Sequence, residues 1–223
     1  MKILPPFLGL LLALGSTAAL SNGNYQLDPN LSSVSFATTK KQYIVEPATL
    51  NLLSGVLSEK GEFQVIAELK SLSTGVPIRD TRLNELYFDA AKYPSVTVSG
   101  VIDWQALADG PVKTNISADV SMYGNTKKMD FPVIIVPTDN YLTVSSSAVV
   151  VVNAADFGIP TENLAKLAET VGGIEISTQV PLTLSLTFIK WYTFAINVVN
   201  NNKKAWWAII RLFLCDKELA LKQ

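Results

Sequence analysis

Alternation of apolar and polar side chains over residues 174–188 is the feature that most limits how this chain can fold. Successive side chains of a β-strand point to opposite faces, so the pattern predicts a long strand with one buried and one solvated face. The apolar face carries Ile174, Ile176, Val180, Leu182, Leu184, Leu186 and Phe188.

The same two-residue period appears in much of the chain before this strand. Residues 115–122 and 129–135 alternate on either side of Gly124-Asn125, a turn-prone pair, and predict a β-hairpin. Long strands with a single apolar face favour a closed or nearly closed antiparallel barrel, or a sandwich. The other predicted strands are residues 33–39, 62–72, 95–104 and 141–152, with a weaker candidate at 51–57.

Two short helices are predicted to interrupt the strand pattern. One covers residues 79–88, just after Pro77. The other covers residues 161–170, where Thr161 can cap the first turn and Gly172-Gly173 ends the helix.

The first residues have the features of a secretory signal peptide. Lys2 precedes an apolar run over residues 3–14, and small residues follow at positions 15–19. The run is shorter than the roughly 20 residues that a membrane-spanning helix requires. We therefore expect residues 1–21 to be a signal peptide, cleaved after Ala19 or Ser21, and the protein to be periplasmic or secreted.

Residue usage excludes several kinds of catalytic and metal site. The chain contains no histidine and a single cysteine, Cys215. A Ser-His-Asp or Cys-His nucleophile and a histidine-ligated zinc are therefore excluded. The formal net charge of −1 gives no reason to expect a nucleic-acid partner. We predict no cofactor, no metal and no catalytic residue, and the sequence leaves the oligomeric state open.

The composition changes after residue 189. Residues 190–223 hold six Lys or Arg, two Asp or Glu, and three of the four tryptophans. Their apolar stretch at 205–210 is too short for a stable membrane span. We predict one β domain over residues 22–189 and an atypical extension over 190–223. The extension is either a membrane-surface anchor or a non-native or recently acquired segment that is disordered or loosely docked.

Four segments, in this order along the chain, resemble one protein family. They are residues 25–36, residues 74–94 with Arg79-Asp80-Thr81-Arg82-Leu83 at their centre, residues 153–159 and residues 180–188. Together they are similar to the YceI-like family of polyisoprenoid-binding proteins. The resemblance implies an all-β fold, an antiparallel lipocalin-like barrel of about eight strands with an elongated apolar cavity, and a long isoprenoid or similar lipid as the ligand. Many relatives carry histidines where this chain has Asn30 and Arg82, so a histidine-dependent role does not transfer.

Inward-facing apolar side chains are the candidate ligand contacts. They either fill the barrel or line a cavity, since barrels of about eight strands do both. Tyr87 and Phe88 are expected to pack the first helix on the barrel. The predicted lining residues are Phe36, Phe63, Val65, Val98, Ile116, Val120, Leu182 and Leu184.

A charged cluster on the first predicted helix has two interpretations. In the first, Arg82 and Glu85 form a surface pair three residues apart. In the second, Arg79 or Arg82 lies at the barrel mouth and meets a lipid headgroup.

These observations favour an exported protein that holds a long apolar lipid of isoprenoid, quinone or polyprenyl type, as carrier or scavenger. Two alternatives stay open at this point. One is a packed envelope interaction domain without a cavity. The other is an enzyme that uses carboxylates alone and acts on a lipid-like substrate, which requires two acids facing inward.

Overall fold

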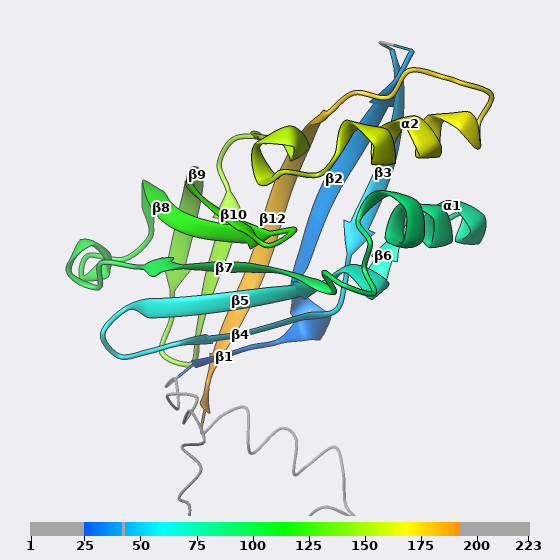
Figure 1. Ribbon diagram of the computed structural model, residues 1–223. Coiled ribbons are helices and arrows are strands. Elements are labelled where there is room, and N and C mark those ends of the chain that lie inside the picture. The colour runs from blue at the N-terminus through cyan, green and yellow to red at the C-terminus, as the bar shows by residue number, and fades with distance from the viewer. Residues whose placement is uncertain (1–24, 42, 192–223) are drawn as a thin grey trace, which may run out of the picture.

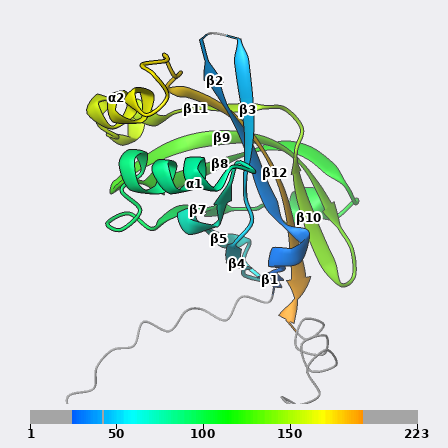
Figure 2. The ribbon, with the colours of Figure 1, turned by 90° about the vertical axis from the view of Figure 1, so that its right-hand side faces the viewer.

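The computed structural model describes residues 25–41 and 43–191, which form one closed β-sheet with two helices at one end (Figure 1). The predicted signal peptide and residues 192–223 of the predicted extension lie outside the described residues. Turning the molecule by 90° shows both helices beside the upper part of the hairpin formed by β2 (Ser33–Lys40) and β3 (Ile44–Leu50) (Figure 2).

Twelve strand segments make up the sheet. Their bounds are β1 (Tyr25–Leu27), β2 (Ser33–Lys40), β3 (Ile44–Leu50), β4 (Leu53–Leu57), β5 (Glu62–Glu68), β6 (Leu72–Ser73), β7 (Ser95–Val101), β8 (Val112–Met122), β9 (Asn125–Pro137), β10 (Tyr141–Ser146), β11 (Val150–Asn153) and β12 (Gln179–Lys190).

The twelve segments correspond to eight antiparallel strands of an up-and-down barrel. Short irregular stretches divide four of the eight, so that β1 continues into β2, β3 into β4, β5 into β6 and β10 into β11. For example, β2 pairs with β3 and β1 pairs with β4, which makes one long interrupted hairpin. The predicted antiparallel barrel is therefore confirmed.

Strand β12 closes the barrel. One of its edges pairs with β10 and β11, and the other pairs with β1 and β2. The alternation over its residues places Val180, Leu182, Leu184, Leu186 and Phe188 inside the barrel. Because both edges of β12 are paired, this long apolar strand is protected from pairing with other chains.

The predicted strand over residues 174–188 begins too early. Strand β12 starts at Gln179, and residue Ile176 forms only an isolated bridge with Lys40. Residues 174–178 instead run as an irregular segment along the end of β2, where the Ser177 N–H donates to the Thr39 carbonyl. Apolar periodicity continues through this segment, but a regular ladder does not.

Strand β3 was not predicted from the sequence. Its alternation is broken by Pro47, which cannot donate a ladder hydrogen bond and therefore argues against a central strand. The structure accommodates this proline because β3 pairs with β2 along its whole length but meets β6 only at Thr49 and Leu50.

The predicted hairpin at Gly124-Asn125 is confirmed, with its turn one residue earlier. Met122 pairs with Asn125, so Tyr123 and Gly124 form a two-residue turn. Both have positive φ, 52° and 78°. This is the type I′ turn whose twist matches the flanking strands.

The two predicted helices are also observed. Helix α1 covers Pro77–Arg82 and continues as a wider π-helical turn over Leu83–Tyr87. Helix α2 covers Thr161–Glu169, and a bond from the Gly173 N–H to the Ala168 carbonyl ends it. The expected cap is wrong: Thr161 is already the first helical residue, and Pro160 precedes it without a side-chain cap.

A candidate lipid cavity in the barrel

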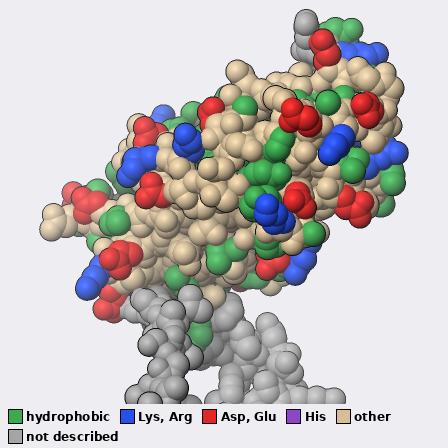
Figure 3. All heavy atoms as spheres, in the orientation of Figure 1, with side chains coloured by type: hydrophobic (Ala, Val, Ile, Leu, Met, Phe, Trp, Pro, Cys, Tyr) green, Lys and Arg blue, Asp and Glu red, His purple; other side chains and the backbone are tan. Residues whose placement is uncertain are grey.

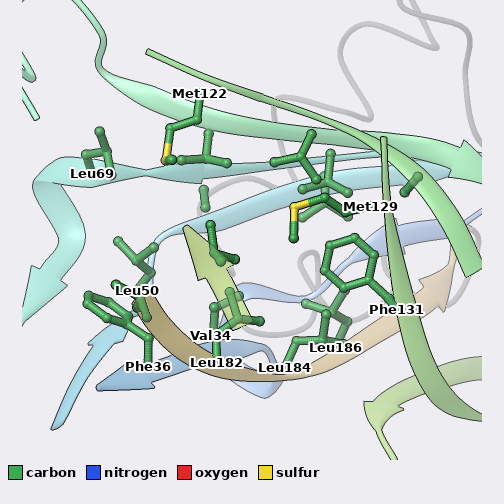
Figure 4. Close-up of a pocket in the computed structure, with 18 of the residues that line it drawn as sticks. Val34, Phe36, Leu50, Leu69, Met122, Met129, Phe131, Leu182, Leu184 and Leu186 are labelled. Atoms are coloured by element: carbon green, nitrogen blue, oxygen red, sulfur yellow. The ribbon is translucent and has the colours of Figure 1, made fainter. Parts of the chain in front are cut away.

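The barrel interior is hollow. Its cavity has a volume of about 210 Å³, and side chains from strands on every side of the barrel line it. Figure 4 shows part of this lining, with Val34, Phe36, Leu182 and Leu184 facing Met122, Met129 and Phe131 across the space. Thr38 and Tyr87 are the only lining residues with a polar side-chain atom, and no lining residue is charged.

One end of the cavity is sealed. Phe188, at the last lining position of β12, is 2% exposed; its cross-strand partner Leu27 is 1% exposed, and Leu57, the partner of Phe63, is 0% exposed. Outside this layer the Tyr25 and Trp104 rings stack with centroids 5.7 Å apart. A ligand therefore has no path through this end.

The other end lies beside the helices, and we infer that it is the mouth. Along β12 the lining runs from Phe188 to Val180, and along β2 it runs from Val34 to Thr38. Thr38 and Val180 are both half-buried. Leu83, Tyr87 and Phe88 of the π-helical turn line the cavity as well, as expected for residues that pack the first helix on the barrel.

Charged side chains begin where the apolar lining ends. Glu46 is the cross-strand partner of Thr38, and Lys40 lies two residues farther along β2 on the same face. The Glu46 carboxylate forms ion pairs with Lys40 Nζ at 2.6 Å and with Arg79 Nη2 of α1 at 3.0 Å. These side chains are only 13% to 28% exposed. We call Lys40, Glu46 and Arg79 the mouth triad; its formal charge is +1.

Two interactions correct the expected pairing on the first helix. Among the described residues no ion pair joins Arg82 to Glu85; the Arg82 guanidinium instead donates to the Thr170 carbonyl at 3.4 Å, at the end of α2. Asp80 accepts from both the backbone N–H and the hydroxyl of Thr74, and so fixes the loop before α1. The geometry therefore directs only Arg79 toward the cavity mouth.

The residues predicted to line the cavity are brought together by the structure. All eight (Phe36, Phe63, Val65, Val98, Ile116, Val120, Leu182 and Leu184) border the same space. Sequence reasoning missed Lys40 and Glu46. The alternation of β2 could have shown Lys40, since it shares a face with Val34, Phe36 and Thr38; Glu46 lies in the unpredicted strand.

Tyr87 is the titratable group of the cavity wall. It is 8% exposed, and burial raises the pKa of its phenol to about 12. The phenol is neutral at physiological pH, and burial extends this neutral range to higher pH, so the group offers a hydrogen bond without a charge. An uncharged, mostly hydrocarbon lining can hold an apolar molecule by desolvation alone.

Neither a metal site nor a membrane span is found in the part of the chain that the structure describes. No group of three or more His, Cys, Asp or Glu side chains there could hold a metal ion. No helix within those residues is long and apolar enough to cross a bilayer. On the face shown in Figure 3, acidic and basic side chains are interspersed over the surface.

Comparison with known proteins agrees with this geometry. The YceI-like domain matches residues 25–188. The fold is similar to the solved structure of a polyisoprenoid binding domain from Saccharophagus degradans implicated in plant cell wall breakdown, at 26% identity and a TM-score of 0.70, covering 75% of this chain and 98% of that one. It is also similar to BcnA from Burkholderia cenocepacia, at 20% identity and a TM-score of 0.57, covering 72% and 98%. No curated protein sequence matches the chain significantly.

Proposed function

The chain belongs to the YceI-like family, and from that membership we propose that it binds a long apolar lipid of isoprenoid, quinone or polyprenyl type in the barrel cavity. The observation that carries the proposal is the cavity itself, which is closed by buried side chains at one end and lined by uncharged side chains throughout. The Saccharophagus degradans domain, which shares the fold at 26% identity, is a polyisoprenoid binding domain.

The cavity lining supplies enough binding energy for such a ligand. Each buried methylene contributes roughly 0.8 kcal/mol, so one five-carbon isoprene unit contributes roughly 4 kcal/mol before costs. Ordering the lipid chain and losing its free motion offset much of this gain. The eight predicted lining residues would make these contacts, and the sealed end would set the length of chain that fits.

The mouth triad would receive the headgroup. Lys40 and Arg79 carry two positive charges against the single carboxylate of Glu46, so a headgroup with acceptor oxygens can take one of the cations as its partner. Arg82 would act less directly, by holding the end of α2 beside the mouth.

We further propose that the protein is exported, and that it works as a carrier or scavenger. The support is its signal-peptide pattern, and a carrier outside the cytoplasm fits a cavity with one mouth. Intact-mass analysis of envelope-fraction protein should show the loss of residues 1–19 or 1–21. Full-length protein in the cytosol would contradict export.

The observations do not favour the two alternatives. A packed interaction domain requires a filled interior, whereas this barrel is hollow. A carboxylate-only enzyme requires two inward-facing acids, and the residues lining the cavity include none.

Native mass spectrometry of freshly purified protein tests the lipid-binding proposal. We expect a bound species whose mass, released on activation, matches an isoprenoid lipid. A bare protein mass, together with no saturable binding of a fluorescent polyprenyl or quinone analogue, would overturn it.

A further inference from the structure

The tip of the β2–β3 hairpin carries apolar side chains that the fold does not use. Tyr43 is 78% exposed, Ile44 42% and Val45 62%. In both ribbon views this tip lies at the top of the molecule, above both helices (Figures 1 and 2). An exposed cluster of this kind marks an interaction surface when it has no structural role.

The apolar side chains occupy both faces of the hairpin. Ile44 pairs with Lys40, on the face that continues from the cavity lining, whereas Val45 pairs with Thr39 on the outer face. A flat protein partner would cover one face of a hairpin and leave the other in water. A lipid interface surrounds an inserted tip and covers both.

Charge and position point to the same partner. Lys41 is exposed beside Tyr43, so a positive group accompanies the aromatic and aliphatic side chains. Aromatic, aliphatic and basic residues together form the pattern of segments that lie in the headgroup region of a bilayer. Ile44 pairs with Lys40, which is two residues beyond the lining residue Thr38, so at about 3.3 Å per residue the base of the tip is about 7 Å from the end of the lining.

We propose that the tip formed by Lys41, Tyr43, Ile44 and Val45 docks into the surface of a lipid bilayer and brings the cavity mouth against it. The docking surface goes beyond lipid binding in the cavity, and it does not require a loaded cavity. Docking gives an apolar ligand a short path between bilayer and barrel without crossing bulk water.

A position-specific label tests the proposal on the full chain. In a Cys215→Ser background, Tyr43→Cys or Val101→Cys would be labelled with an environment-sensitive fluorophore and mixed with vesicles of phosphatidylcholine and phosphatidylglycerol. Val101, at the end of β7, is the control because it is the same residue type as Val45 in the tip and is equally exposed, 61% against 62%. We expect a blue shift for the label at position 43 and none at position 101.

Aspartate substitutions measure the affinity. We expect Val45→Asp to weaken vesicle binding by about ten-fold or more, because it places a charge in the interface, and Val101→Asp to leave it unchanged. Equal responses at the two positions, or no shift at position 43, would overturn docking through the tip. A shift at position 43 that grows with protein concentration in the absence of vesicles would overturn it in favour of a second copy of the chain. A chain that docks but binds no polyprenyl analogue would leave this proposal standing and defeat the proposed function.

Discussion

Replacing Leu184 by tryptophan should weaken lipid binding while leaving the unliganded barrel nearly as stable as wild type. Leu184 lies midway along β12 and borders the cavity of about 210 Å³. An indole at this position can occupy space that no neighbouring side chain fills. Leu142 on the adjacent strand β10 is the matched control, since it is 1% exposed and is not part of the cavity wall.

The expected magnitudes differ between the two sites. Overpacking a filled core costs about 1–3 kcal/mol, and in a chain of this size each kcal/mol lowers the unfolding midpoint by roughly 2–4 °C. We expect this cost for Leu142→Trp and less than about 1 kcal/mol for Leu184→Trp. If the indole displaces one isoprene unit of the ligand, the loss of roughly 4 kcal/mol raises Kd by about 1,000-fold.

Two measurements on each variant are sufficient. The thermal midpoint without lipid reports the cost of packing, and titration with a fluorescent polyprenyl analogue reports the affinity. The opposite outcome is that Leu184→Trp loses as much stability as Leu142→Trp and still binds the analogue like wild type. That result would mean that the interior is packed in solution and that the analogue binds elsewhere.

Glu46→Gln should lower the free energy of unfolding by about 1–3 kcal/mol, because Lys40 and Arg79 lose a partly buried carboxylate; an unchanged denaturation midpoint would show that these pairs contribute nothing. Burial raises the pKa of Tyr87 from 10.0 to about 12. Between these two pH values Tyr87 therefore ionises only in the unfolded chain. The free energy of unfolding should fall by up to about 3 kcal/mol as the pH rises over this interval. Tyr87→Phe should show a smaller fall in the same denaturation series, and an equal fall would assign the effect to other groups. A chain ending at Lys190 should unfold within about 4 °C of the full chain, because the last paired strand ends there; a loss of several kcal/mol would mean that the extension packs on the barrel.

The strands that could be predicted from the sequence are those in which apolar and polar side chains alternate regularly. In β12, Leu182 and Leu184 alternate with Thr183 and Ser185, and register alone decides which residues face inward. Because a one-residue slip would expose every apolar side chain, such patterns determine the interior reliably. This is why all eight predicted lining residues border the cavity.

Interruptions within strands were not predictable from the period. Residues 141–152 alternate as one strand, but the structure divides them into β10 and β11 around Ser147. The Ser147 N–H bonds to the Pro132 carbonyl on β9, a contact between residues far apart in sequence. Similarly, the mouth triad joins β2, β3 and α1, so its assembly depends on tertiary packing that local sequence does not encode.

The sequence pattern also could not predict the volume of the barrel interior. One row of cross-strand pairs shows how side-chain size determines it. Phe63 on β5 pairs with Gly100 on β7, and Gly100 pairs with Ala118 on β8. A Cβ at Gly100 would lie 2.9 Å from the Phe63 ring and 3.3 Å from the Ala118 methyl group. The glycine therefore lets the large ring lie against the barrel wall, and the cavity remains open at this level.

Gly100→Ala tests whether this arrangement keeps the cavity open. The added methyl group should push the Phe63 ring away from the wall and into the lumen, because the ring is the movable end of a side chain that already borders the cavity. Alanine also restricts the unfolded chain, which offsets the contact by about 0.4–1 kcal/mol, so we expect little change in stability. Affinity for the polyprenyl analogue should fall by about ten-fold, since part of one isoprene unit loses its space.

The double variant Gly100→Ala/Phe63→Leu is the control, and it should recover most of the affinity because the smaller side chain leaves room for the methyl group. If the single variant binds normally, or if the double variant binds no better than the single one, the ring of Phe63 does not control the width of the cavity.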